Sequence, residues 1–146
     1  MGITGIGYEG LTLDAFVSKL RVRGVQTLVD VRLNAISRKK GFSKRALSDV
    51  LAESGIEYVH MPALGNHRDN RAGYGELNSA FAQEARARFI DTLASEAAVS
   101  ALKELTDLAR GGDVAVFCFE QDETHCHREQ VISEVNGLLR RDLVEA

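Results

Sequence analysis

The chain of 146 residues is poor in cysteine, proline and tryptophan, with two, one and none of these residues. Two cysteines are too few for the disulfide framework of a small secreted protein, so we expect a reduced, cytoplasmic location. No apolar run approaches the roughly 20 residues that a membrane span requires. The first residues also lack the basic and apolar regions of a secretory signal, and we expect no membrane partner. The length predicts one domain over residues 1–146.

Positive charge is also scarce outside one segment. The chain has 18 Lys+Arg against 21 Asp+Glu, but residues 31–48 contain no acid. The positive side chains of that segment are Arg32, Arg38, Lys39, Lys40, Lys44 and Arg45. The remaining chain has 12 positive and 21 negative side chains. This distribution excludes a uniformly basic nucleic-acid-binding surface, whereas a local anion-binding patch is compatible with it.

Apolar patterning predicts strands that alternate with helices. Strands are expected over residues 3–7, 25–31, 56–61 and 113–119, and a short last strand over residues 142–145. Helices are expected between Thr12 and Gly24, between Ser43 and Gly55, over residues 77–93 and 99–108, and after residue 124. The alternation predicts a three-layer α/β sandwich, in which helices cover both faces of a mainly parallel sheet of four or five strands.

Polar residues follow each of the four main predicted strands. In a parallel sheet, ligands bind beyond the carboxyl ends of the strands, where such side chains meet. The candidate catalytic residues are Asp30, His60, Glu120 and His127, because acid–base chemistry needs carboxylates and imidazoles together. The candidate substrate- or anion-binding residues are Tyr8, Arg32, Arg38, His125, Cys126 and Arg128. The alternative is that these polar residues are an ordinary solvated edge.

The sequence CFEQDETHCHREQ connects the last main strand to the final helix. If Asp122 or Thr124 caps this helix, residues 125–128 occupy its first turn, where unpaired N–H groups and the helix dipole favour an anion. The same position would favour the thiolate form of Cys126, which gives a nucleophile as a second hypothesis. Cys118 lies within an apolar strand, so we expect it to be an inert core residue.

The sequence contains partial signals for two cofactors, NAD and zinc, and we expect neither. Gly5, Gly7 and Gly10 match the spacing of a dinucleotide-binding fingerprint, with Asp30 twenty residues further on. All three glycines precede the predicted helix, whereas the fingerprint needs its third glycine inside the helix, so NAD is not expected. Zinc is not expected because consecutive helical residues diverge by about 100° and residues 125–127 would not face one ion.

Two loops are candidates for contact with a ligand. The basic segment 32–45 is either a solvated surface, a nucleic-acid contact or a clamp for a phosphate group. The loop over residues 63–76 is either a flexible connector or a lid over the site. The polar and aromatic residues of this loop are His67, Arg68, Asn70, Arg71 and Tyr74.

The stretches TGIGYEGLTLDAFVSKL, LVDVR, SRKKGFSKRALSDVLAESGIEYVHMPALG and VFCFEQDETHCHREQVI resemble the domain-of-unknown-function family 488. The most specific parts are the segments 30–32, 42–43, 58–64 and 126–128. The family's C-x-E strand end and C-H-R junction correspond to residues 118–120 and 126–128. The resemblance implies an α/β domain but no particular activity, and the segment after Leu64 departs from the family pattern.

Three functions fit the sequence. The first is a small enzyme with acid–base, hydrolase-type chemistry that acts on a phosphate-bearing molecule, such as a nucleotide or a nucleic acid. The second is a non-catalytic module that binds nucleic acid or protein through residues 32–45. The third is a sulfurtransferase or redox thiol protein, because LVDVR resembles a rhodanese strand and Cys126 is a candidate thiolate. The oligomeric state does not follow from the sequence.

Overall fold

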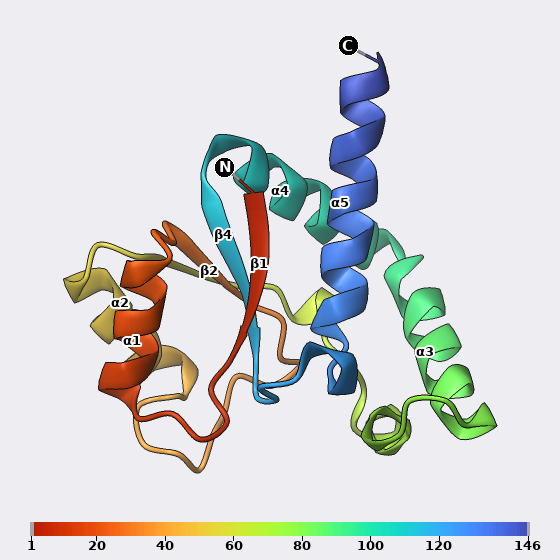
Figure 1. Cartoon of the computed structure of the whole chain (residues 1–146), viewed down its shortest axis with the longest axis horizontal. Helices are drawn as coiled ribbons and strands as arrows, with labels where there is room; N and C mark the ends of the chain where they lie inside the picture. The colour runs from red at the N-terminus through yellow and green to blue at the C-terminus, as the bar shows by residue number, and fades with distance from the viewer. Residues whose placement is uncertain (1, 146) are drawn as a thin grey trace.

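The computed structural model describes residues 2–145 (Figure 1). Its strands are β1 (Gly2–Gly7), β2 (Thr27–Asp30), β3 (Glu57–His60) and β4 (Asp113–Cys118). Its helices are α1 (Leu13–Val22), α2 (Lys44–Glu53), α3 (Ala80–Leu93), α4 (Glu96–Gly111) and α5 (Arg128–Glu145). None of these helices is long and apolar enough to cross a membrane.

The four strands form one parallel sheet in the order β1-β4-β2-β3. Helices α1 and α2 cover one face, and α3, α4 and α5 lie on the other, as Figure 1 shows. The predicted α/β sandwich is therefore confirmed. Because every strand runs in the same direction, the ends of β1, β2 and β4 lie at one edge, with Gly7 opposite Cys118 and Asp30 opposite Phe117.

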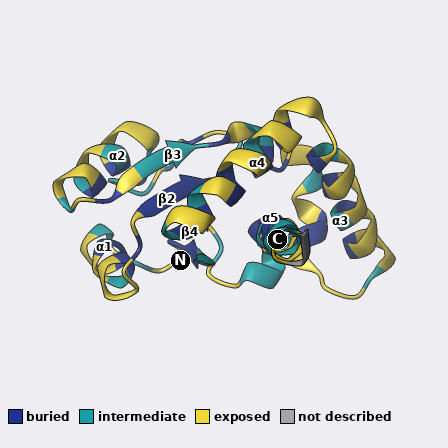
Figure 2. Ribbon diagram, turned by 90° about the horizontal axis from the view of Figure 1, so that it is seen from above, coloured by how far each residue is buried: buried dark blue, intermediate teal, exposed yellow. Residues whose placement is uncertain are grey.

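Strand β4 lies between two apolar cores. Because both of its faces are buried, its sequence is a nearly continuous apolar run. Val114, Val116 and Cys118 face the core under α4 and α5, whereas Ala115 and Phe117 face the core under α1 and α2. Strand β2 is also buried throughout, but the edge strand β3 is half exposed (Figure 2). The central strands therefore hold the carboxyl-terminal edge in a fixed position between two packed layers.

Local sequence signals place several element ends correctly. The Thr12 hydroxyl accepts a hydrogen bond from the backbone N–H of Ala15, which caps α1 as predicted. Gly24 and Gly55, which follow α1 and α2, have φ values of +70° and +74°, which glycine adopts without a steric cost.

Three predicted elements differ from the structure. Residues 142–145 continue α5 instead of forming a strand, because a helix satisfies its own backbone hydrogen bonds and a strand there would need a partner. Helix α3 begins at Ala80, where the Ser79 hydroxyl caps it, and not at residue 77. The final helix begins at Arg128, after a 3-10 turn over Glu123–His125 and the extended residue Cys126.

Candidate functional site

A cavity of about 150 Å³ opens at the carboxyl ends of β1, β2 and β4. Its lining residues are Tyr8, Arg32, Leu33, Asn34, Ile36, Asn66, Arg71, Tyr74, Cys118, Phe119, Glu120, Cys126 and His127. Five of the residues selected from the sequence are among them. The topology thus brings residues that are distant in sequence together around this cavity. The cavity lies at the carboxyl ends of the strands, where open α/β sheets bind their ligands.

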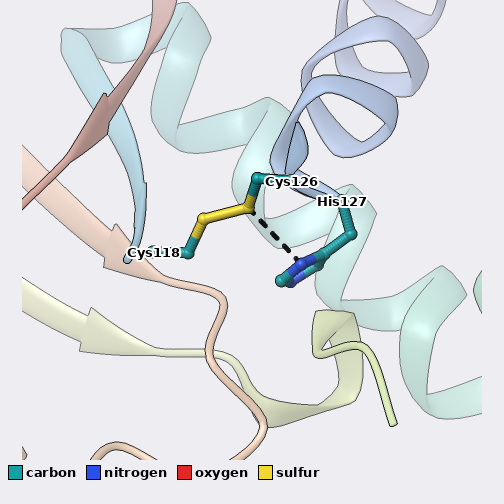
Figure 3. Close-up of side chains that lie close together, drawn as sticks. All are labelled: Cys118, Cys126 and His127. Atoms are coloured by element: carbon teal, nitrogen blue, oxygen red, sulfur yellow. Dashed lines mark hydrogen bonds between the residues drawn. A yellow bond between two sulfur atoms is a disulfide. The ribbon is translucent and has the colours of Figure 1, made fainter. Parts of the chain in front are cut away.

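A disulfide joins Cys118 at the end of β4 to Cys126, just before α5 (Figure 3). Cys118 is a buried core residue, as expected, but its bond to Cys126 shows that it is not an isolated, inert thiol. The alternation of β4 places Cys118 on the face that α5 covers, and the chain before α5 brings Cys126 to the same face. Both side chains are almost fully buried and both line the cavity.

The His127 imidazole lies beside this disulfide, with its Nδ1 atom 3.6 Å from Cys126 Sγ (Figure 3). Its Nε2 atom lies 2.8 Å from the Val31 carbonyl oxygen, an acceptor, so Nε2 carries the proton. Burial lowers the pKa of His127 to about 4 and outweighs the hydrogen bond to Val31, which raises it. The ring is therefore neutral near pH 7, with an unprotonated Nδ1 directed at the sulfur atoms.

Arg128 is fully buried behind the disulfide and fixes the loop that precedes α5. Its Nη1 donates to Cys118 Sγ at 3.0 Å and to the Glu120 carbonyl, and its Nη2 donates to the Gln121 carbonyl at 2.9 Å. Burial lowers the pKa of Arg128, although the carboxylates of Glu123 and Glu120 oppose this effect. The guanidinium contacts backbone and sulfur, and Arg128 is not among the residues that line the cavity.

Asp30 and Arg32 form a buried ion pair at the end of β2. Arg32 Nε and Nη2 donate to the Asp30 carboxylate at 2.9 and 2.7 Å, and Nη1 donates to the Phe42 carbonyl at 2.7 Å. The Tyr58 hydroxyl donates to the same carboxylate. Burial opposes the charge of Arg32, but the hydrogen bonds and field of Asp30 raise its pKa overall. These contacts occupy both charged groups and tie β2, β3 and the basic segment together.

The remaining residues selected from the sequence lie in different surroundings. Tyr8 lines the cavity, stacks on Phe42 with ring centroids 4.5 Å apart, and donates from its hydroxyl to Ser37. His60 Nε2 lies 2.8 Å from the Arg32 carbonyl oxygen and does not line the cavity. Arg38 and His125 also lie outside its lining, so the structure does not bring them to this cavity. Their predicted roles in binding or catalysis remain predictions.

The polar loop 63–76 supplies cavity residues that were not selected as site residues. Asn66 is buried and accepts a hydrogen bond from Asn70 at 3.0 Å, while Arg71 Nε donates to the Asn66 carbonyl. Burial raises the pKa of Tyr74 to about 12, and its hydroxyl donates to the Gln130 side chain on α5. The unusual length and glycine content of this loop were the only features of the sequence that indicated a role at the site. Which of its residues line the cavity depends on how the loop packs against α3 and α5.

The cavity combines a dithiol/disulfide pair, a neutral imidazole and the Glu120 carboxylate, and the exposed residue Arg71 is also part of its lining. Glu120 Oε2 lies 3.7 Å from Cys118 Sγ. Arg71 is solvent-exposed, whereas the charge of Arg32 is matched by Asp30. These groups can support sulfur nucleophilicity, proton transfer and the binding of a small anion.

Comparison with known proteins gives a family but no described activity. The family model for the domain of unknown function DUF488 matches residues 12–135. No curated protein and no solved structure matches the chain. The matched region includes β2, β3 and β4, both cysteines and the first turns of α5, so it spans most of the cavity. The chain therefore belongs to the family of the domain of unknown function DUF488.

Proposed function

We propose that this protein is a thiol–disulfide oxidoreductase that acts on a small, anionic, sulfur-containing substrate in the cavity at the strand ends. The observation that carries the proposal is the placement of both cysteines in the cavity lining, with an unprotonated imidazole nitrogen 3.6 Å from Cys126 Sγ. In a cytoplasmic protein, the location expected from the low cysteine count, a disulfide is usually transient and catalytic. The proposal develops the third function inferred from the sequence.

The reaction can be written from the reduced protein with a small disulfide, RSSR. Cys126 gives its proton to His127 Nδ1, and its sulfur attacks one sulfur of RSSR. The RS–SR bond breaks, RS⁻ leaves and takes the proton from His127, and Cys126 carries a mixed disulfide. Cys118 then gives its proton to the Glu120 carboxylate, whose Oε2 lies 3.7 Å from Cys118 Sγ, and the Cys118 thiolate attacks Cys126 Sγ. The second RS⁻ leaves and takes up the proton from Glu120. The sum is the oxidation of the dithiol and the reduction of RSSR to two RSH.

The side chains around the two cysteines have different roles in this reaction. His127 holds the proton only briefly, because its pKa of about 4 favours the neutral ring. The Arg128 guanidinium, whose Nη1 lies 3.0 Å from Cys118 Sγ, favours the thiolate form of the resolving cysteine. Arg71 lies at the cavity with its charge exposed to solvent, and it is suited to bind a carboxylate, sulfonate or phosphate group of the substrate.

The hydrolytic acid–base enzyme proposed from the sequence has less support. Asp30 is held by Arg32 and Tyr58, and His60 contacts the backbone of Arg32, so neither faces a substrate in the cavity. Glu120 and His127 line the cavity, but Glu120 Oε2 lies 3.7 Å from Cys118 Sγ and His127 Nδ1 lies 3.6 Å from Cys126 Sγ, so both groups are placed beside the sulfur atoms. A phosphate-bearing molecule remains compatible with the proposal as a substrate if it also carries reducible sulfur.

A nucleic-acid-binding module is the second candidate, and it rests on the exposed part of the basic segment. Arg38, Lys40, Lys44 and Arg45 are exposed, whereas Phe42 is fully buried and unable to stack on a base. Gel shifts with single- and double-stranded DNA over a salt series test this candidate. Binding that weakens steeply with salt and is lost when these four residues become alanine would support it.

The oxidoreductase is tested by mixing reduced protein with two disulfides of opposite charge, the disulfide of mercaptoethanesulfonate and cystamine. We expect the wild type to release two thiols per protein, and Cys118→Ser to stop at a mixed disulfide on Cys126 that mass spectrometry detects. Cys126→Ser should abolish the fast reaction. A wild type that reacts no faster than a free thiol of similar pKa, or a Cys126→Ser protein with an unchanged rate, would refute the proposal.

The anionic character of the substrate is tested separately with a matched pair of variants. Arg71→Ala should slow the reaction with the sulfonate disulfide about five- to tenfold and leave that with cystamine unchanged, as expected for loss of one partly solvated charge contact. Arg68→Ala is the control, because Arg68 is an exposed cation of the same loop that does not line the cavity. Equal effects of the two substitutions would rule out a specific role for Arg71.

A further inference from the structure

We infer that the reduced form of the protein binds one thiophilic divalent cation, of which zinc is the natural example, through Cys118, Cys126 and His127. The three potential ligand atoms, two Sγ and the imidazole Nδ1, lie within 4.8 Å of one another, and all three residues are buried (Figure 3). They line a cavity through which an ion can reach them. The inference rests on this geometry and not on turnover by the oxidoreductase.

The spacing of sulfur and nitrogen fits tetrahedral zinc. With Zn–S near 2.3 Å and Zn–N near 2.0–2.1 Å, a tetrahedral site separates sulfur from nitrogen by about 3.6 Å. Cys126 Sγ and His127 Nδ1 are 3.6 Å apart. One edge of the coordination polyhedron is therefore present before any ion binds.

The two cysteines reach the remaining positions once the disulfide is reduced. Zinc-bound sulfur atoms are separated by about 3.8 Å, as follows from the same bond length and the tetrahedral angle. The Cα atoms of Cys118 and Cys126 are 7.5 Å apart, which is wider than the range of about 4.4–6.8 Å that is usual for a bridged pair. The sulfur atoms can therefore move apart by rotation of their side chains while β4 and the start of α5 stay in place.

Backbone conformation explains why three residues close in sequence can share an ion with β4. The expectation that zinc does not bind assumed that residues 125–127 are consecutive helical residues. Cys126 instead has an extended backbone, with φ −139° and ψ 146°, and α5 begins only at Arg128. Cys126 and His127 therefore turn toward the same point, and β4 supplies the third ligand. That geometric objection does not apply to this structure.

The surroundings already contain the contacts that orient metal ligands. His127 Nε2–H donates to the Val31 carbonyl, which leaves Nδ1 free to coordinate, as is usual for metal-bound histidine. Arg128 Nη1 donates to Cys118 Sγ and would stabilise the thiolate that coordination requires. Three protein ligands leave a fourth position toward the cavity, and Glu120 Oε2, 3.7 Å from Cys118 Sγ, is placed beside it.

Binding is measured with reduced protein, a non-thiol phosphine reductant and zinc in competition with a colorimetric chelator. We expect one equivalent of zinc on the reduced wild type and none on the disulfide form. Cobalt(II) should give intense tetrahedral d–d bands together with sulfur-to-metal charge-transfer bands. No disulfide substrate is present, so failure of zinc binding and failure of the oxidoreductase are observed independently.

The variants separate this site from binding elsewhere on the surface. Cys118→Ser, Cys126→Ser and His127→Gln should each weaken zinc binding at least about 100-fold, since each removes a direct ligand. Glutamine can retain the hydrogen bond to Val31, so His127→Gln tests the ligand with little change in packing. His125→Gln is the control and should bind zinc as the wild type does. Absence of zinc binding by the reduced wild type, or equal binding by the oxidised form or the three ligand variants, would overturn the inference.

Discussion

Replacing Asp30 with alanine tests whether the buried ion pair at the end of β2 is architectural. Asp30 is fully buried and accepts hydrogen bonds from Arg32 and Tyr58, and Arg32 is 8% exposed. Removing the carboxylate leaves a guanidinium with no matching charge in a largely buried position. Breaking a buried pair in this way costs about 3–5 kcal/mol, a large part of the roughly 5–15 kcal/mol that stabilises an ordinary domain.

The loss is measured by urea unfolding, with the free energy extrapolated to zero denaturant. The control is the double variant Asp30→Val with Arg32→Met, which removes both charges and fills the space with apolar atoms. Since buried pairs replaced as a unit often cost little, the double variant should be more stable than Asp30→Ala. A loss below about 1 kcal/mol for Asp30→Ala, or a double variant less stable than Asp30→Ala, would show that the pair does not stabilise the fold as argued.

Two further predictions concern the close packing of Gly7 against Glu120 and the buried imidazole of His127. Gly7→Ala should destabilise the protein by about 1–3 kcal/mol in urea unfolding, because a Cβ at Gly7 would lie 1.9 Å from the Glu120 carbonyl oxygen; an unchanged unfolding midpoint would contradict this packing. Burial lowers the pKa of His127 from 6.5 to about 4, so the unfolded chain binds a proton that the folded protein does not. The free energy of unfolding should therefore fall by up to about 3 kcal/mol as pH drops from 6.5 to 4, and be unaffected by this group above that range. His127→Gln should lack this part of the pH dependence, and equal pH profiles for the two proteins would refute the assignment.

The sequence by itself determined the fold class and the edge at which the cavity lies. The alternation of strands and helices, and the apolar run 113–119, report burial directly, because backbone geometry fixes the period with which side chains face a core. Thr12 caps the start of the first helix, and glycines end the first two helices. These effects involve only residues that are close in sequence, so they could be predicted without knowledge of distant contacts.

The functional groups at that edge were decided by the tertiary structure. Asp30 and Arg32 were candidates for catalysis and anion binding, but in the structure they bond to each other, and Asp30 also accepts from Tyr58 on the neighbouring strand. Arg71 and Tyr74 reach the cavity through a loop of short 3-10 turns that has no apolar period. Side-chain direction in such segments depends on packing against distant elements, which a local pattern does not encode.

The two cysteines show most clearly the difference between what local sequence predicts and what tertiary structure decides. The sequence placed Cys118 in a strand and Cys126 in a helical turn, and each position has an ordinary explanation when considered alone. The structure joins them because β4 presents Cys118 on the face covered by α5, while an extended backbone at residue 126 directs the second sulfur back toward the sheet. The sequence was sufficient to predict the residue types that lie at the strand ends. That two sulfur atoms and an imidazole nitrogen lie close together depends on the path of the chain in three dimensions, which the local sequence does not determine.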